Sequence, residues 1–364
     1  MSDGATRRLV AGVARVSAEG TRPPLWHGMA AGLLALPFHL VTVGAAGGGV
    51  FLVLFGGTTW HRILGVLLLL LAAGTVPRPH RRPRHSARLT SAQAPVLFGL
   101  VRSVADDVHA PMPAEILISR DVNALVTRVG WRRRRVLLLG APLWVASPPQ
   151  ARIALLGHEL GHFAHGDLMR SFWVGGALDS GIWWLGVMTP GAISDGYSRI
   201  VDVVFFAPWR RVLVSYLELM LLANGPAHRR QEVMADLDGL RVGGSDGAIA
   251  LMDTLLAEPS ISVAMTRSAI SAQPTDMWES VRAQVLAVPE IERERRRRAA
   301  ALDRNRIDDS HPTTAFRMEL LKSRPFVVGQ VQPDGAAWAR VDAELAGAMS
   351  NSARHARDAA RFDR

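Results

Sequence analysis

The 364-residue sequence contains no cysteine. Its absence rules out disulfide bonds and agrees with a reducing compartment, although many exported proteins also lack cysteine. The chain has no internal repeat, so nothing indicates a repeat architecture. Charge is almost absent from two stretches, residues 29–55 and 63–76, which are separated only by residues 56–62. The chain therefore carries strongly apolar segments beside its more polar parts.

The two apolar stretches predict a transmembrane helical hairpin over residues 28–77, behind a basic tail of residues 1–27. A helix needs about 20 apolar residues to cross the hydrocarbon core. The first stretch is long enough, and the second needs residues 59–60 or the following turn to complete it. A cleaved signal peptide is the alternative, but the run is too long, starts late and is followed by a second apolar run.

Basic residues flank the predicted hairpin on both sides. Arginines of the tail precede it, and a basic linker of residues 78–90 follows it. Since basic residues near helix ends stay on the cytoplasmic side, we expect a multi-pass protein of the cytoplasmic membrane whose following domain faces the cytoplasm. The net charge of +10, with runs at 132–135 and 295–298, could indicate nucleic acid. Beside a bilayer, attraction to anionic lipid explains the basic residues more simply, so no nucleic acid is expected.

The remaining chain predicts an α+β, mainly helical domain over residues 91–325. Strand-like segments at 115–119 and 135–139 flank residues 123–126 and favour a small antiparallel sheet. Ser147, with proline after it and Gln150 three positions on, predicts a capped helix start. A hydrophobic helical insert at 171–223 contains Arg210 and Arg211, so two and four membrane spans both stay open. A charged helical tail is expected at 326–364.

The run from His158 to His162 carries the chemistry. Residues four apart share one face of a helix, so His158 and His162 present two imidazoles to one metal ion, with Glu159 beside the same point. Zinc binds such imidazoles together with a carboxylate and keeps a fourth position for water. Glu159 is then placed to take a proton from water as it attacks a peptide carbonyl. We expect one Zn²⁺ per chain.

The third ligand must come from elsewhere in the chain. A histidine six residues after the second His is one known arrangement, but position 168 is leucine. The other arrangement uses a glutamate from a later helix, and Glu232 is the best candidate. Asp236, four residues on, can orient His158 by accepting a hydrogen bond from its free ring nitrogen. His165 is an alternative ligand, although a surface or orienting role is favoured.

These residues resemble the HtpX-like membrane metalloproteases of metallopeptidase family forty-eight, relatives of the CAAX prenyl proteases. The resemblance runs through residues 158–167, 229–236 and 310–317 and covers most of residues 25–325. It implies a zincin-type (gluzincin) catalytic domain in which His158, His162 and Glu232 bind zinc, Glu159 is the base and Asp236 orients a ligand. It also implies that Asn123 and Ala124 belong to an edge strand that pairs with substrate.

Two further residues match later positions of that family. His311 and Arg317 could each donate a hydrogen bond to the developing oxyanion. Equally, His311 could form a turn before a helix while Arg317 binds a carboxylate such as Asp308.

The resemblance implies a zinc endopeptidase that is bound to the lipid bilayer and cleaves membrane or misfolded polypeptides. A regulatory protease that clips one signalling partner would carry the same site. A CAAX-type prenyl peptidase is less favoured, because those relatives use more membrane helices than this length permits. An inactive membrane scaffold would be expected to lack a ligand or the base, and His158, Glu159, His162 and Glu232 are all present.

Overall fold

The structure, a computed structural model, describes residues 26–77, 80–130, 132–165, 171–189, 202–271, 276–302 and 313–362. The chain divides into two compact units. We call the first the sheet unit; it comprises Met1–Ala11, Pro79–Asp167 and Arg229–Arg364. The second, the apolar unit, comprises Gly12–Arg78 and Leu168–His228.

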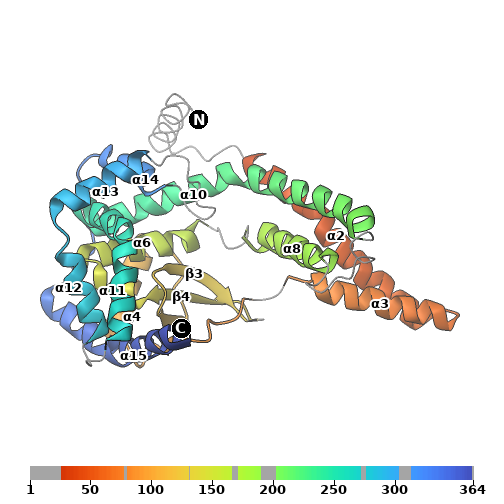
Figure 1. Ribbon diagram of the computed structural model, residues 1–364, viewed down its shortest axis with the longest axis horizontal. Helices are drawn as coiled ribbons and strands as arrows, with labels where there is room; N and C mark the ends of the chain where they lie inside the picture. Colours follow the sequence, from red (N-terminus) through yellow and green to blue (C-terminus); the bar gives the residue numbers. More distant parts are fainter. Residues whose placement is uncertain are drawn as a thin grey trace. The chain divides into compact units, whose positions relative to one another are not determined.

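Helices make up the described part of the apolar unit (Figure 1). They are α2 (Trp26–Phe55), α3 (Thr59–Thr75), the π-helical turn η1 (Ser171–Gly175), α8 (Gly176–Met188), the π-helical turn η2 (Asp202–Phe206) and the part of α10 (Ala207–Leu256) up to His228. Within α2, the segment Met29–Phe55 is long and apolar enough to cross a membrane. Helix α3, at 17 residues, is shorter. A bent pair formed by α10 and α11 (Glu258–Ile270) is a second candidate span in the described chain.

Small residues allow the helices of the apolar unit to approach closely. A Cβ on Gly49 would lie 2.9 Å from the carbonyl oxygen of Gly65, so α2 and α3 pack backbone against backbone. Ala31, Ala35 and Ala177 belong to a buried cluster with Leu217 and Met220, which joins α2, α8 and α10. Large hydrophobic side chains, including Leu33, Phe51, Trp209 and Leu222, remain exposed on the outside. An apolar exterior of this extent is typical of a surface that meets lipid or another protein.

Arg210 does not stand alone in this apolar setting. Its guanidinium forms a salt bridge with Asp202 and donates to the carbonyl oxygen of Met188 at 2.8 Å. Buried hydroxyls are also satisfied: Thr42 donates to Thr75 at 2.9 Å, and Ser180 donates to the Thr75 carbonyl at 2.7 Å. These polar groups are therefore paired, as burial away from water requires.

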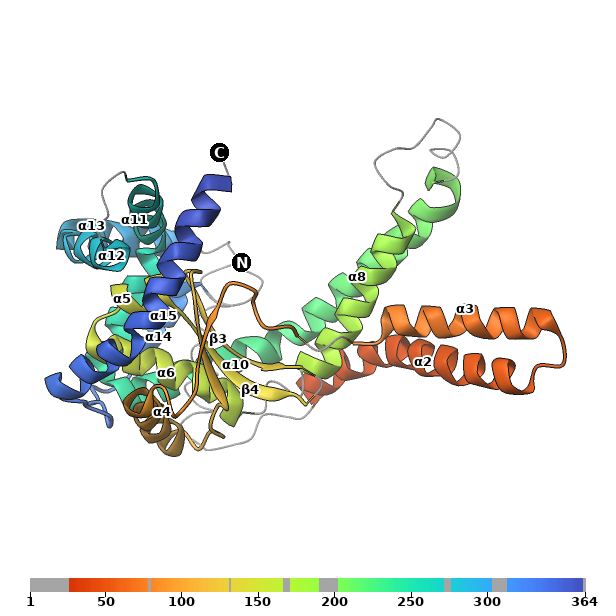
Figure 2. The same cartoon turned by 90° about the horizontal axis from the view of Figure 1, so that it is seen from below.

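The sheet unit contains a four-stranded sheet in the order β1-β2-β4-β3. Figure 2 labels its neighbouring strands β3 and β4. Its strands are β1 (Ala87–Leu89), β2 (Glu115–Ser119), β3 (Ala124–Val129) and β4 (Arg134–Gly140). The antiparallel sheet predicted from the sequence is wrong in one respect, because β2 and β4 are parallel. Strand β4 is apolar on both faces and buried from Val136 onward, which suits the centre of a sheet. The half-exposed strand β3 lies at the edge.

The other described regular elements of the sheet unit are helices. They are α4 (Pro95–Asp107), α5 (Ala141–Ala146), α6 (Pro149–Ala164), the remainder of α10, α11, α12 (Met277–Leu286), α13 (Glu290–Leu302), α14 (Thr314–Lys322) and α15 (Gly335–Phe362). Helix α15 packs beside α4, β1 and β2, while α6 packs beside α4 and β3.

The start of α4 is capped from a distance. Glu344 of α15 accepts hydrogen bonds from the backbone N–H groups of Val96 and Leu97, at 2.8 and 2.9 Å. A carboxylate at a helix N-terminus satisfies free N–H groups and complements the helix dipole. Residues beyond 325 are therefore part of the folded core of the sheet unit.

The predicted cap of α6 is wrong. Ser147 donates to the carbonyl oxygen of Leu143 at 2.7 Å and ends α5, and Pro148 stands at the N-cap of α6 without a side-chain bond. The short helix α5 directly before α6 takes up the serine. Proline at the first position still suits the start of α6, since its missing N–H would have no partner there.

Candidate metal centre

Glycines bring α6 and α10, which are both labelled in Figure 1, into direct backbone contact. A Cβ on Gly239 would lie 2.7 Å from the carbonyl oxygen of Ala154, and a Cβ on Gly243 would lie 2.7 Å from the Ala154 nitrogen. From the other side, a Cβ on Gly157 would lie 3.0 Å from the Cα of Gly239. The two helices can approach this closely only because these positions have no side chain. Side chains that face this contact from both helices must therefore meet.

Three such side chains form a potential metal site. Ligand atoms of His158 and His162, from α6, and of Glu232, from α10, all lie within 4.8 Å of one another. Nε2 of each histidine lies 3.7 Å from an oxygen of the Glu232 carboxylate. Ligands of a tetrahedral zinc ion are separated by about 3.4 Å, given metal–ligand distances near 2.0–2.1 Å. Two imidazoles and one carboxylate at this spacing fit a zinc ion.

The polar groups of the site are withdrawn from water. His158 and Glu232 are 3% and 1% exposed, and Glu159, which follows His158 on α6, is 5% exposed. Buried carboxylates and imidazoles cost folding free energy unless they are paired or bind a cation. The concentration of such groups in one place is typical of a functional site.

Asp236 and Arg317 support His158 from behind. The Nδ1 atom of His158 lies 2.9 Å from the Asp236 carboxylate. Arg317, from α14, donates two hydrogen bonds from Nε and Nη2 to that carboxylate, at 2.9 and 2.6 Å. With Nδ1 held by a carboxylate, the lone pair of Nε2 is left for a metal.

The charges of this group are strongly coupled. Burial opposes ionisation of the Asp236 carboxyl, but the charge of Arg317 and hydrogen bonds from His158 and Arg317 outweigh it, so the Asp236 pKa lies well below its usual range. Burial also opposes the charge of Arg317, but Asp236 and the more distant Glu232 and Glu159 raise its pKa. Asp236 and Arg317 therefore form a buried ion pair.

The other predicted site residues are His165, His311 and Arg317. Nε2 of His165 lies 2.7 Å from Asp238, so this imidazole joins α6 to α10 beyond the metal cluster. His311 lies outside the described residues. Arg317 binds a carboxylate, as one of the two sequence interpretations proposed, and the carboxylate that it binds is that of Asp236. The suggested partner Asp308 lies outside the described residues.

Ala124 is the first residue of the edge strand β3, and Asn123 directly precedes it. The N–H of Gly140 donates to the Asn123 carbonyl at 2.7 Å, and the N–H of Gly130 donates to the His80 carbonyl at 3.1 Å. By the alternation of an antiparallel pair, the N–H and C=O groups of residues 124, 126 and 128 face away from β4. The N–H of Ala124 is taken by its neighbour's side chain, Oδ1 of Asn123, at 2.8 Å.

Comparison with known proteins assigns the family. The model described as Peptidase family M48 matches residues 91–325. The chain belongs to this family. Curated relatives named Protease HtpX include one from Pseudomonas syringae pv. tomato, 24% identical over 226 residues that cover 60% of this chain and 73% of the relative. Another, from Chromohalobacter salexigens, is 28% identical over 171 residues, covering 44% and 56%. The predicted resemblance to HtpX-like metalloproteases is thus confirmed.

Sequence reasoning missed two parts of the site. The glycine contact between α6 and α10 has a signal, since Ala235, Gly239, Gly243 and Gly247 recur every four residues. The ion pair of Arg317 with Asp236 has no such signal, because 81 residues separate the partners. An arginine far from a metal motif can pair with any carboxylate, so only the fold identifies its partner.

Proposed function

We propose that the chain is a membrane-anchored zinc endopeptidase that hydrolyses peptide bonds of membrane or misfolded proteins. The observation that supports this most directly is the convergence of His158, His162 and Glu232 beside the buried carboxylate of Glu159, in a chain of Peptidase family M48. Membership of a peptidase family indicates the class of reaction, and the two imidazoles and one carboxylate indicate zinc as the metal.

Each residue of the site then has a defined task. His158, His162 and Glu232 hold the ion, and Asp236 with Arg317 fixes the ring of His158. Zinc, when bound, polarises the scissile carbonyl and makes water more acidic. Glu159 accepts the proton of the attacking water, and the protonated Glu159 can then donate this proton to the leaving amine. His311 remains a proposed oxyanion donor, whereas Arg317 is better explained as a positioning residue, since Asp236 occupies its guanidinium.

Strand β3 is the proposed substrate edge. Its outward backbone groups at Val126 and Arg128 can pair with an extended polypeptide, with Asn123 and Ala124 at the start of the strand. Strand addition recognises backbone more than side chains, so broad specificity for unfolded segments follows.

Membrane attachment rests on the apolar unit. Its segment Met29–Phe55 can span a bilayer, and much of its hydrophobic surface is exposed. The same proposal includes the hairpin of residues 28–77, the linker of residues 78–90 and, as alternatives, an insert at 171–223 that crosses the bilayer or lies in its interface. Residues 326–364, expected as a charged helical tail, contain α15, which packs beside α4, β1 and β2. The basic residues on either side of the apolar run favour a cytoplasmic sheet unit.

The decisive experiment replaces the base and leaves the ligands intact. Purified Glu159→Gln protein should retain stoichiometric zinc but lose cleavage of an unfolded model protein. Glu232→Ala should lose zinc as well. The matched control is Glu279→Gln, which removes an exposed carboxylate of α12 and should cleave like the wild type. Full proteolysis by Glu159→Gln would refute the assigned base.

Experiments with Glu159→Gln and with the wild type also distinguish the two alternative functions, a regulatory protease and an inactive scaffold. Proteins trapped by Glu159→Gln in membranes should be many and varied for a general protease, whereas a single trapped partner would identify a regulatory protease. A wild type that binds zinc but cleaves nothing would indicate a scaffold.

A further inference from the structure

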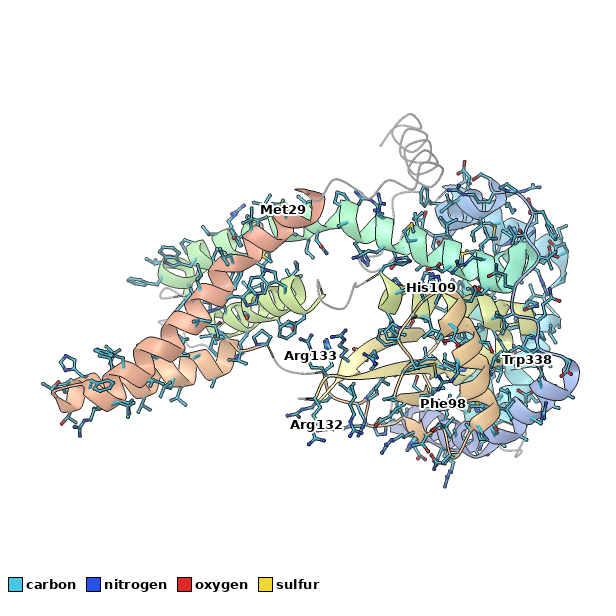
Figure 3. All side chains as sticks on the ribbon, turned by 180° about the vertical axis from the view of Figure 1, so that it is seen from behind. Met29, Phe98, His109, Arg132, Arg133 and Trp338 are labelled. Atoms are coloured by element: carbon cyan, nitrogen blue, oxygen red, sulfur yellow. The ribbon has the colours of Figure 1, made fainter. Side chains whose placement is uncertain are left out.

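One end of the sheet carries a concentrated positive charge. Residues 80–90 and 128–135 contain no aspartate or glutamate. Figure 3 shows Arg132 and Arg133 at the tip of the β3–β4 hairpin, where the turn closes with a hydrogen bond from the Arg133 N–H to the Gly130 carbonyl at 2.9 Å. We call the following set the hairpin patch: Arg81, Arg82, Arg84, Arg88, Arg128, Arg132, Arg133, Arg134 and Arg135.

Three arginines of the hairpin patch share one buried carboxylate. Glu115, 1% exposed, lies 2.7 Å from Arg82, 3.1 Å from Arg88 and 3.4 Å from Arg134. These three arginines keep 44% to 49% of their side-chain surface in solvent. One negative charge shared by three cations leaves a positive surplus, to which the exposed Arg132 and Arg135 add.

The cations of the patch repel one another. Partial burial, followed by the charges of Arg133 and Arg135, lowers the pKa of Arg128. Like charges gathered at one end of a fold oppose folding unless an external anion compensates them. This surface therefore favours a polyanionic partner.

The other arginine-rich run differs. On α13, Arg295 and Arg296 pair with Glu292, Arg298 pairs with Glu294, and Arg297 pairs with Asp253. These ion pairs largely cancel the positive charge within the helix and its neighbour. Of the two basic runs in the sequence, only the one in the hairpin patch thus presents a strong surplus among the described residues.

Only a short stretch of chain joins α3 to the hairpin patch. Only residues 77–79 separate Val76, which caps α3, from His80, which bridges to Val129 at the hairpin tip. Four peptide units reach at most about 14 Å. If α3 lies in a bilayer, the patch therefore cannot move far from the headgroups, and attraction between charges acts over about 8–10 Å at physiological salt.

We propose that the hairpin patch is a docking surface for the anionic headgroups of the membrane into which α2 and α3 insert. This rests on the membrane insertion of the proposed function and adds a defined contact of the sheet unit with lipid. Because the patch includes Arg128 of β3 and the turn that follows this strand, headgroup binding holds the edge strand at the membrane surface, where unfolded segments of membrane proteins emerge.

The absence of cysteine allows a direct test. Ala114, exposed beside the patch, is replaced by cysteine in the full-length chain and labelled with a fluorophore. The protein is placed in nanodiscs of phosphatidylglycerol mixed with phosphatidylcholine, or of phosphatidylcholine alone, with a quencher attached to the lipid headgroup. A label at Gly347 of α15, where an added side chain meets nothing within 4 Å, serves as the reference position.

Quenching at position 114 should be stronger in the anionic discs and should fall to the neutral-disc level at about 1 M salt, where the screening length is near 3 Å. Arg132→Gln combined with Arg133→Gln removes two of the nine cations and should cause part of this loss. Arg295→Gln combined with Arg298→Gln removes equal charge from α13 and should leave the quenching unchanged.

Equal quenching in both kinds of disc would overturn the proposal, as would an equal loss in the α13 control. Tight binding of a single-stranded RNA probe without lipid-dependent quenching would also overturn it, in favour of a nucleic-acid surface. A chain that fails to enter nanodiscs would contradict the membrane part of the proposed function, which is a separate and visible outcome. The readout does not depend on peptidase activity.

Discussion

Gly239→Ala tests whether the close contact of α6 and α10 creates the metal site. The added Cβ would lie 2.7 Å from the carbonyl oxygen of Ala154. A carbon–oxygen contact needs about 3.4 Å, so the helices must separate by about 0.7 Å or rotate. Glu232 lies seven residues earlier, two turns away on nearly the same face of α10. A shift of this size exceeds the tolerance of about 0.2 Å in metal–ligand distances.

The expected result is a loss of metal affinity with only modest loss of stability. Overpacking costs about 1–3 kcal/mol, and alanine gains about 1 kcal/mol over glycine in a helix, so the free energy of unfolding should fall by about 0–2 kcal/mol. Zinc affinity should fall by about tenfold or more, the effect seen when groups that orient ligands are removed. Competition with a chromophoric chelator measures the affinity, and denaturant unfolding of the metal-free protein measures the stability.

Gly99→Ala is the matched control. Gly99 lies inside α4, and a Cβ there meets nothing within 4 Å. This variant should gain about 0.5–1 kcal/mol from helix propensity and bind zinc unchanged. The reasoning is refuted if Gly239→Ala binds zinc as tightly as Gly99→Ala and is equally stabilised.

Three further outcomes are expected. Arg317→Met leaves the Asp236 charge buried without its cation, so denaturant unfolding should show a loss of about 3–5 kcal/mol, partly recovered on adding Asp236→Asn; full additivity would contradict the pairing. Val126→Pro removes one outward N–H from the edge strand. It should lower kcat/KM for a polypeptide about two- to twelve-fold, the equivalent of one hydrogen bond. The N–H of Thr127 faces β4, so Thr127→Pro should unfold the sheet instead. Glu344→Ala uncaps α4 and should cost about 1–2 kcal/mol in thermal or chemical unfolding, with no change in zinc affinity; a neutral effect would show that the contact contributes nothing.

Local spacing explains why much of the site was predictable. His158 and His162 share a helix face by the period of 3.6 residues, and Glu232 and Asp236 do so by the same rule. Both pairs need only a helix to be arranged correctly, so the sequence contains nearly all of the information. Runs of apolar residues in the sequence likewise indicated β2, β4 and the apolar helices.

Long-range pairing explains what was not predictable. Strands β2 and β4 are parallel neighbours in the sheet, although β3 lies between them in the sequence. Nothing in the alternation of either strand specifies that neighbour. Ser147 carried a capping signal but ends α5, because an unforeseen short helix precedes α6. Glu344 caps a helix almost 250 residues away, a contact that only the packing of α15 creates.

The dependence of the metal site on three separate helices has a physical consequence. His158 comes from α6, Glu232 and Asp236 come from α10, and Arg317 comes from α14. In the unfolded chain these groups are far apart, so the free energy of metal binding is available only to the folded state and adds to its stability. Conversely, the folded metal-free protein must hold Glu159 and Glu232 out of water without a cation between the ligands, which costs free energy. The metal should therefore raise the unfolding temperature of the wild type far more than that of Glu232→Ala, and equal shifts would show that the ion binds elsewhere.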